Sequence, residues 1–118
     1  MLSKVAFTLY PVKDMAACRA FYEGALGLRT EAGDTSPWVE YDLPGGGCFA
    51  ITTVMPVQPG GGTIAFEVDD LPALVERLKA GGIRMAHGDL IKGPHCRMMT
   101  VFDPDGNALI LHQLDGPR

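Results

Sequence analysis

The order of predicted secondary structure occurs twice along the chain, and this repetition limits the possible folds more than any other feature. An alternating apolar strand over residues 3–12 precedes a helix whose N-cap is Asp14, and the same order returns with a strand over 63–68 and a helix capped by Asp70. At a constant shift of 56 positions, four residue pairs match: Val12 with Val68, Asp14 with Asp70, Met15 with Leu71 and Ala17 with Ala73. We therefore expect two similar modules.

Each predicted helix has an apolar stripe and ends at glycine, at Gly27 in the first half and at Gly81 in the second. Three more strands are predicted in each half, near residues 28–32, 37–43 and 48–54 and near 83–86, 96–102 and 107–113. Residues 56–62 hold two prolines and three glycines, which is typical of a linker. We expect one domain over residues 1–118, with modules at 1–55 and 63–118 joined by this linker.

Composition excludes several classes of protein. The net charge is −4, which gives no electrostatic footprint for nucleic acid or for an anionic membrane. The N-terminus has no signal-peptide pattern, and no apolar run is long enough for a membrane helix. Cys18, Cys48 and Cys96 are scattered, which argues against a disulfide framework and a zinc knuckle. The sequence predicts a cytoplasmic protein with neither nucleic acid nor membrane as a partner.

Three stretches resemble the vicinal oxygen chelate superfamily, also called the glyoxalase/bleomycin resistance/dioxygenase superfamily. They are VKDM leading to FYEGALGL over residues 12–28, IAFEVDDL over 64–71, and DPDGN over 103–107. The resemblance implies an α+β fold in which two βαβββ modules, each with a four-stranded sheet, form curved mixed sheets around a cup. Many members are homodimers, so a homodimer is also expected.

Strand alternation then predicts which side chains face the cup and which pack under the helices. The residues expected to face the cup are Val5, Phe7, Leu9, Phe49, Ile51, Thr63, Ala65, Glu67, Ala108, Ile110 and His112. Those expected to pack under the helices are Ala6, Ile64, Phe66, Leu109 and Leu111.

The resemblance also implies four metal-ligand positions, one each on the first, fourth, fifth and eighth strands, and they fall at Phe7, Ile51, Thr63 and Ile110. Phenylalanine and isoleucine have no donor atom, and threonine is a poor, neutral donor. Moving the alignment by one residue, for example to Ala50 or Thr52, does not restore a donor set. The sequence predicts a member with no metal site and no cofactor.

An apolar cup without a metal suits a protein that binds a small apolar or aromatic molecule. The expected ligand-binding residues are Phe7, Trp38, Phe49, Ile51, Thr63, Ile110 and His112, with Thr63 and His112 as the polar contacts. Trp38 fits a ligand wall and the core equally well.

The alternative function is a lyase, isomerase or dioxygenase of the same superfamily with an atypical or metal-free active site. His112 or Glu67 would then be the acid–base group, although both residues also fit exposed strand ends. The loop from His87 to His95 could cover the cup and touch the ligand.

Overall fold

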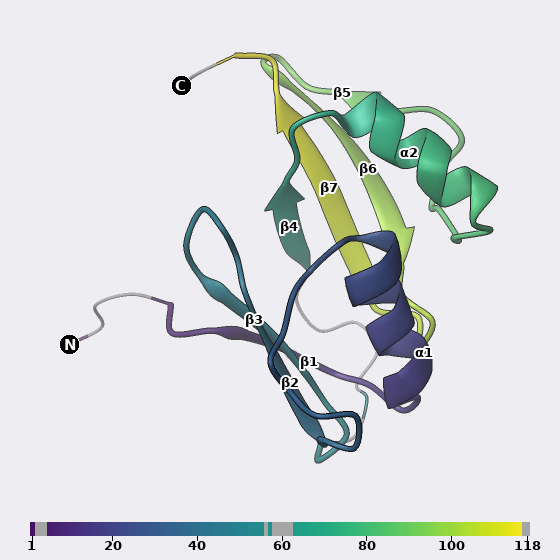
Figure 1. The fold of residues 1–118 in the computed structure, drawn as a ribbon. Coiled ribbons are helices and arrows are strands. Elements are labelled where there is room, and N and C mark those ends of the chain that lie inside the picture. The colour runs from purple at the N-terminus through teal and green to yellow at the C-terminus, as the bar shows by residue number, and fades with distance from the viewer. Residues whose placement is uncertain (2–4, 56, 58–62, 117–118) are drawn as a thin grey trace. The chain divides into compact units, whose positions relative to one another are not determined.

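The computed structural model describes residues 1, 5–55, 57 and 63–116 of the chain (Figure 1). It forms two compact units, Met1–Gly60 and Gly61–Arg118. Of the predicted linker at 56–62, all residues but Val57 lie outside the described part. Among the described residues, no helix is both long and apolar enough to cross a membrane.

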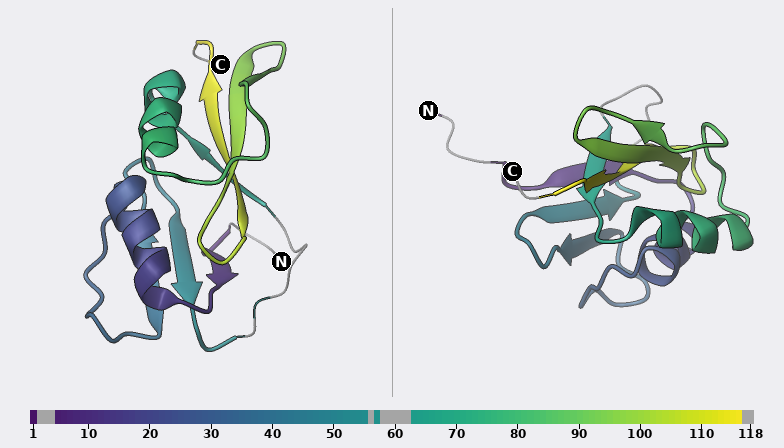
Figure 2. Two further views of the ribbon diagram at one scale, coloured as in Figure 1. Left: turned by 90° about the vertical axis from the view of Figure 1, so that its right-hand side faces the viewer. Right: turned by 90° about the horizontal axis from the view of Figure 1, so that it is seen from above.

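The first unit is a three-stranded sheet with one helical segment (Figures 1 and 2). Strand β1 (Thr8–Pro11) pairs in parallel with β3 (Cys48–Thr52), and β3 pairs antiparallel with β2 (Trp38–Asp42). Helix α1 (Met15–Arg19) continues into a π-helical stretch, η1 (Ala20–Ala25). The predicted N-cap is confirmed, because Oδ1 of Asp14 accepts the Ala17 amide at 3.0 Å. The chain leaves the helix at Gly27, whose φ of 76° favours glycine.

The core of the first unit lies between the helical segment and one face of the sheet. Tyr22 of η1 packs on Phe49 of β3, with the ring centroids 5.0 Å apart, and Phe49 stacks on Tyr41 of β2. The side chains of all three are fully buried. Aromatic burial therefore joins the helix to the sheet in this unit.

This core corrects the predicted orientation of β3. Phe49 and Ile51 were expected to face away from the helix, but both are fully buried on the helix-covered face, beside Tyr41 and Val39 in the strand register. All but the last residue of β3 are apolar, and the strand is almost entirely buried. The sequence of β3 therefore does not indicate which alternate side chains face the helix. The opposite face, which we call the helix-free face of the first unit, carries Leu9, Trp38, Glu40, Asp42, Ala50 and Thr52.

The strand predicted near 28–32 is wrong. The guanidinium of Arg19 donates to the carbonyl oxygens of Ala32 and Gly33 at 3.2 and 2.7 Å, and the Ala32 amide donates to Oγ1 of Thr30. These local hydrogen bonds take the place of a sheet ladder. The sheet of the first unit therefore has three strands rather than the four implied by the resemblance.

The second unit is a four-stranded sheet in the order β4-β7-β6-β5 with one helix, α2 (Leu71–Ala80) (Figure 1). Its strands are β4 (Ile64–Glu67), β5 (Ile91–Lys92), β6 (Cys96–Phe102) and β7 (Ala108–Leu114). Oδ1 of Asp70 accepts the Ala73 amide at 3.2 Å, which repeats the Asp14 cap 56 residues later. Of the strand predicted at 83–86 only one bridge remains, between Met85 and Val101, and β5 forms the edge instead.

The predicted orientation of β7 is confirmed. Leu109 and Leu111 are buried, as are Met99 and Val101 of β6 beside them and Leu71, Val75 and Leu78 of α2. The helix-free face of the second unit carries Ala65, Glu67, Met98, Thr100, Ile110 and His112. These side chains are half-buried or exposed.

The stretch Asp103–Asn107 is a turn that joins β6 to β7. The buried carboxylate of Asp103 accepts the amides of Asp105 and Asn107, each at 2.9 Å, and the Asn107 side-chain amide at 2.9 Å. Gly106 has a φ of 86°, which suits glycine at this position. Asp103 therefore acts as the organiser of the turn.

Candidate functional site

The structure separates the seven predicted ligand-binding residues into three groups. Trp38 lies on the helix-free face of the first unit, and Phe7 contacts its ring edge to face with centroids 5.9 Å apart. Ile110 and His112 lie on the helix-free face of the second unit, and Thr63 is exposed just before β4. Phe49 and Ile51 lie in the core of the first unit and have no exposed surface for a ligand.

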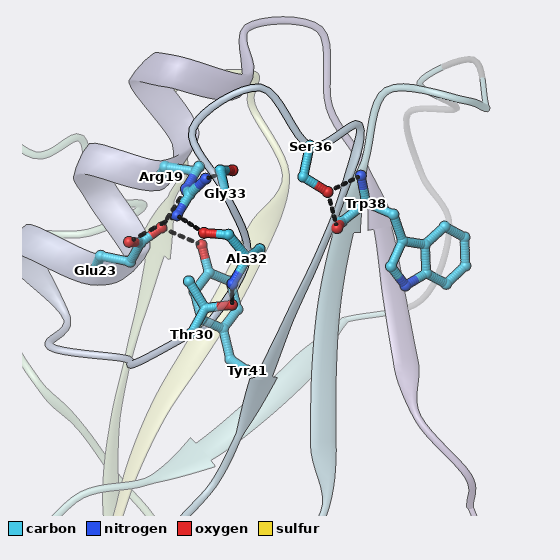
Figure 3. Close-up of polar contacts among 8 residues, drawn as sticks. All are labelled: Arg19, Glu23, Thr30, Ala32, Gly33, Ser36, Trp38 and Tyr41. Atoms are coloured by element: carbon cyan, nitrogen blue, oxygen red, sulfur yellow. Dashed lines mark hydrogen bonds and ion pairs between the residues drawn. The ribbon is translucent and has the colours of Figure 1, made fainter.

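Trp38 lines a hollow of about 780 Å³ in the first unit, which we call the Trp38 hollow. Nε1 of Trp38 donates to the Glu40 carboxylate at 2.8 Å, and the Ser36 hydroxyl donates to the Trp38 carbonyl at 2.6 Å. Figure 3 shows the indole pointing away from the Arg19 side of the unit. The lining is mostly polar: Arg29, Thr30, Glu31, Ala32, Ser36, Trp38, Glu40 and Asp42.

A charged cluster holds the loop that forms one wall of the Trp38 hollow (Figure 3). Oε2 of Glu23 accepts hydrogen bonds from Nε of Arg19 at 2.7 Å and from the Tyr41 hydroxyl at 2.9 Å. The hydrogen bond from Arg19 lowers the pKa of Glu23, while burial, followed by the bond to Glu23, raises the pKa of Tyr41. With Arg19 also bound to the carbonyls of Ala32 and Gly33, the cluster fixes the loop to the helix and to β2.

The second unit brings together two residues that were predicted only as separate candidates. Glu67 of β4 and His112 of β7 are direct neighbours in the parallel register, and Oε1 of Glu67 lies 2.6 Å from Nδ1 of His112. The other oxygen of Glu67 accepts the Leu114 amide at 2.7 Å, so the carboxylate is held at both ends. The His112 side chain is 20% exposed and that of Glu67 52%.

His112 also lines a hollow of about 680 Å³, the His112 hollow. Its other lining residues are Pro94, His95, Cys96, Leu114, Asp115 and Gly116, and the Asp115 amide donates to the His95 carbonyl at 2.9 Å. Of the loop predicted to touch ligand, His95 reaches this hollow. His87 is not part of its lining, and its Nδ1 lies 2.8 Å from the Asp89 carbonyl oxygen.

The residues at the implied metal positions do not fit a divalent ion. Phe7 and Ile110 carry only carbon in their side chains, and Ile51 lies on the helix-covered face. Its neighbours on the helix-free face are Ala50 and Thr52, which supply at most one neutral hydroxyl. Within the described part of the chain, no three His, Cys, Asp or Glu residues are grouped so that they could hold a metal ion.

Comparison with known proteins identifies the fold. A family model described as the glyoxalase/bleomycin resistance protein/dioxygenase superfamily matches residues 4–111. No curated protein sequence matches the chain significantly.

Solved structures of the same fold include TnmS3, an antibiotic binding protein from Streptomyces sp. CB03234, at 24% identity and a TM-score of 0.76 over 96% of this chain and 97% of that one. A glyoxylase/bleomycin resistance protein/dioxygenase domain from Frankia sp. EAN1pec has 22% identity and a TM-score of 0.77 over 100% and 96%. A lactoylglutathione lyase from Agrobacterium tumefaciens has 19% identity and a TM-score of 0.75 over 95% and 94%.

Proposed function

This chain belongs to the glyoxalase/bleomycin resistance protein/dioxygenase superfamily, and from that premise we propose that it is a metal-free protein that binds a small apolar or aromatic molecule. The candidate ligand contacts in the first unit are Phe7 and Trp38, and those in the second unit, taken by itself, are Thr63, Ile110 and His112. Phe49 and Ile51 are left out of this proposal because they are buried under the helix of the first unit.

One observation carries the proposal. Where the superfamily resemblance places metal ligands, this chain has the carbon side chains of Phe7 and Ile110, and both lie on the side of their unit that no helix covers. Phe7 is 44% exposed and contacts the Trp38 ring edge to face, so its apolar surface is accessible to a ligand. Burial of apolar ligand surface against such residues supplies the affinity, at about 25 cal/mol per Å² before the costs of association.

Two further observations support the proposal. TnmS3, which shares the fold, is described as an antibiotic binding protein, so the fold is compatible with binding as a function. The three cysteines are thiols rather than disulfides, which fits action in the reducing cytoplasm.

A second candidate function is a metal-free lyase or isomerase, which the Glu67–His112 pair favours because a carboxylate-bound histidine can move a proton. The two functions differ in turnover, since a binding protein returns its ligand unchanged. Product analysis after prolonged incubation with a bound compound therefore distinguishes them.

The proposal is tested with N-phenyl-naphthylamine, a neutral aromatic probe whose emission rises in apolar surroundings. We expect a saturable rise with the native protein, and Ile110→Ala and Phe7→Ala should each weaken binding several-fold because they remove apolar contact area. Ile91→Ala is the matched control, since Ile91 is exposed on the edge strand β5. A non-saturable signal, or one unchanged in both test variants, would refute the proposal.

A further inference from the structure

The hydrogen bond between Glu67 and His112 fixes which nitrogen of His112 accepts a proton. An ionised carboxylate can only accept hydrogen bonds, so Nδ1 of His112 carries the hydrogen that Glu67 binds at 2.6 Å. In the neutral imidazole, Nε2 then carries a lone pair. Among the described residues none hydrogen-bonds to Nε2, so this acceptor is left for a ligand.

The backbone keeps this arrangement in place. Glu67 and His112 are paired in the β4–β7 register, and the second carboxylate oxygen of Glu67 accepts the Leu114 amide at 2.7 Å. The carboxylate cannot turn away from the imidazole without losing that bond. The orientation of the imidazole is therefore set by the sheet, with Nδ1 toward Glu67 and Nε2 as the remaining acceptor.

The surroundings of His112 are partly apolar and partly titratable. Met98 is its direct neighbour on β6 and is uncharged. In the His112 hollow, Pro94 and Leu114 supply apolar surface, and the other titratable groups are His95, Cys96 and Asp115. Within the described ranges, Glu67 is the one carboxylate bonded to His112.

We propose that the ligand is an aromatic compound with an acidic hydroxyl group, and that His112 binds it by taking its proton. This inference rests on the proposed function and narrows its ligand class. The ligand O–H bond breaks and an Nε2–H bond forms, giving a phenolate and an imidazolium with no change in the net charge of the complex. The imidazolium then lies between two anions, the phenolate and Glu67.

The experiment compares para-nitrophenol with para-nitroanisole, in which a methyl group replaces the acidic hydrogen. The nitrophenolate ion is yellow, so its absorption band reports the position of the proton directly. At a pH slightly below the ordinary pKa of the phenol, we expect binding to increase the phenolate band. Para-nitroanisole should bind at least about tenfold more weakly, because it cannot donate to Nε2.

Two variants of the pair and one control test the role of each residue. His112→Gln should remove the increase of the phenolate band on binding and weaken para-nitrophenol binding about tenfold, to the level of para-nitroanisole. Glu67→Gln keeps an acceptor for Nδ1 but removes the charge, so binding should persist with a smaller phenolate band. His87→Gln is the control, because His87 is not part of the His112 hollow, and it should behave as the native protein does.

The outcomes separate this inference from the proposed function. Equal binding of both compounds, or a binding-induced increase of the phenolate band that persists in His112→Gln, overturns the inference and leaves the aromatic site intact. If neither compound binds while N-phenyl-naphthylamine does, the ligand class is wrong. If no aromatic probe binds, both proposals fail.

Discussion

The hydroxyl of Tyr41 lies 2.9 Å from Oε2 of Glu23, the same oxygen that accepts Nε–H of Arg19 at 2.7 Å. One carboxylate oxygen therefore joins strand β2 to the helical segment of the first unit. The Arg19 side chain is only 15% exposed and that of Glu23 30%, so the cluster is partly shielded from water. It differs in this respect from ion pairs on the open surface, which contribute little to stability.

We expect Glu23→Gln to lower the free energy of unfolding by about 1–3 kcal/mol, because it weakens hydrogen bonds to a charged acceptor. Glu76→Gln is the matched control: Glu76 also faces a cation on its own helix, Lys79 at 4.0 Å, but its side chain is 78% exposed. The control should change stability by no more than about 0.5 kcal/mol. Urea denaturation measures both, and equal effects would contradict a structural role for the cluster.

The same carboxylate predicts a pH dependence. The hydrogen bond from Arg19 lowers the pKa of Glu23 in the folded state, so the stabilisation is fully present above the unfolded-state pKa of about 4.3. It is lost as the pH falls through the lowered folded-state pKa, where Glu23 takes up its proton. The stability difference between the native protein and Glu23→Gln should therefore shrink below about pH 4. Denaturation curves at several acidic pH values check this, and a constant difference would contradict it.

Ile110→Glu should abolish binding of N-phenyl-naphthylamine while the fold survives with reduced stability. The substitution places a carboxylate at a half-buried position between Ala65 and Thr100, where burial disfavours the charge. Ile91→Glu makes the same chemical change on the exposed edge strand β5 and should leave binding intact. Circular dichroism verifies the fold of each variant, and unchanged affinity in Ile110→Glu would move the ligand site elsewhere.

The purified protein should retain no stoichiometric divalent metal ion after dialysis. The physical reason is the lack of donor atoms in Phe7 and Ile110 and the orientation of Ile51 into the core. Elemental analysis, repeated after incubation with zinc and with nickel, is the measurement. About one ion per chain that survives dialysis would refute the expectation.

We expect a two-fold homodimer in solution, with a mass twice the 12.6 kDa of the chain. Val5 and Val54 are 76% and 66% exposed, and such apolar side chains are candidates for burial in the dimer interface. Light scattering combined with size exclusion, at micromolar concentration and after dilution, measures the mass. A single-chain mass throughout would contradict the expectation.

The helices and the last strand could be predicted because local chemistry determines them. Asp14 and Asp70 cap their helices as the sequence indicates, since capping needs only a short polar side chain and a nearby free amide. In β7 the apolar core positions Leu109 and Leu111 alternate with Ala108, Ile110 and His112, and the turn residues from Asp103 fix where the strand begins.

The errors occur where distant parts of the chain decide the structure. Nothing within residues 28–32 shows that Arg19 takes up the carbonyl of Ala32, so the segment was predicted as a strand. For β3, apolar side chains at every position but the last do not indicate which face meets the core, and the pairing with β2 decides it. The Glu67–His112 pair was missed because the register between β4 and β7 joins residues 45 positions apart, although both had been placed on the same face.

Because residues 28–32 form no strand, β2 is an edge strand of its sheet, and β3 is its one partner among the described strands. The unpaired backbone groups of an edge strand can pair with a strand from another molecule and so begin aggregation. Here Pro37 and Pro44 stand on either side of β2 and limit how far a foreign strand could pair, while Glu40 and Asp42 would repel an identical strand laid alongside. The short length and the two negative charges of β2 therefore oppose edge-to-edge association.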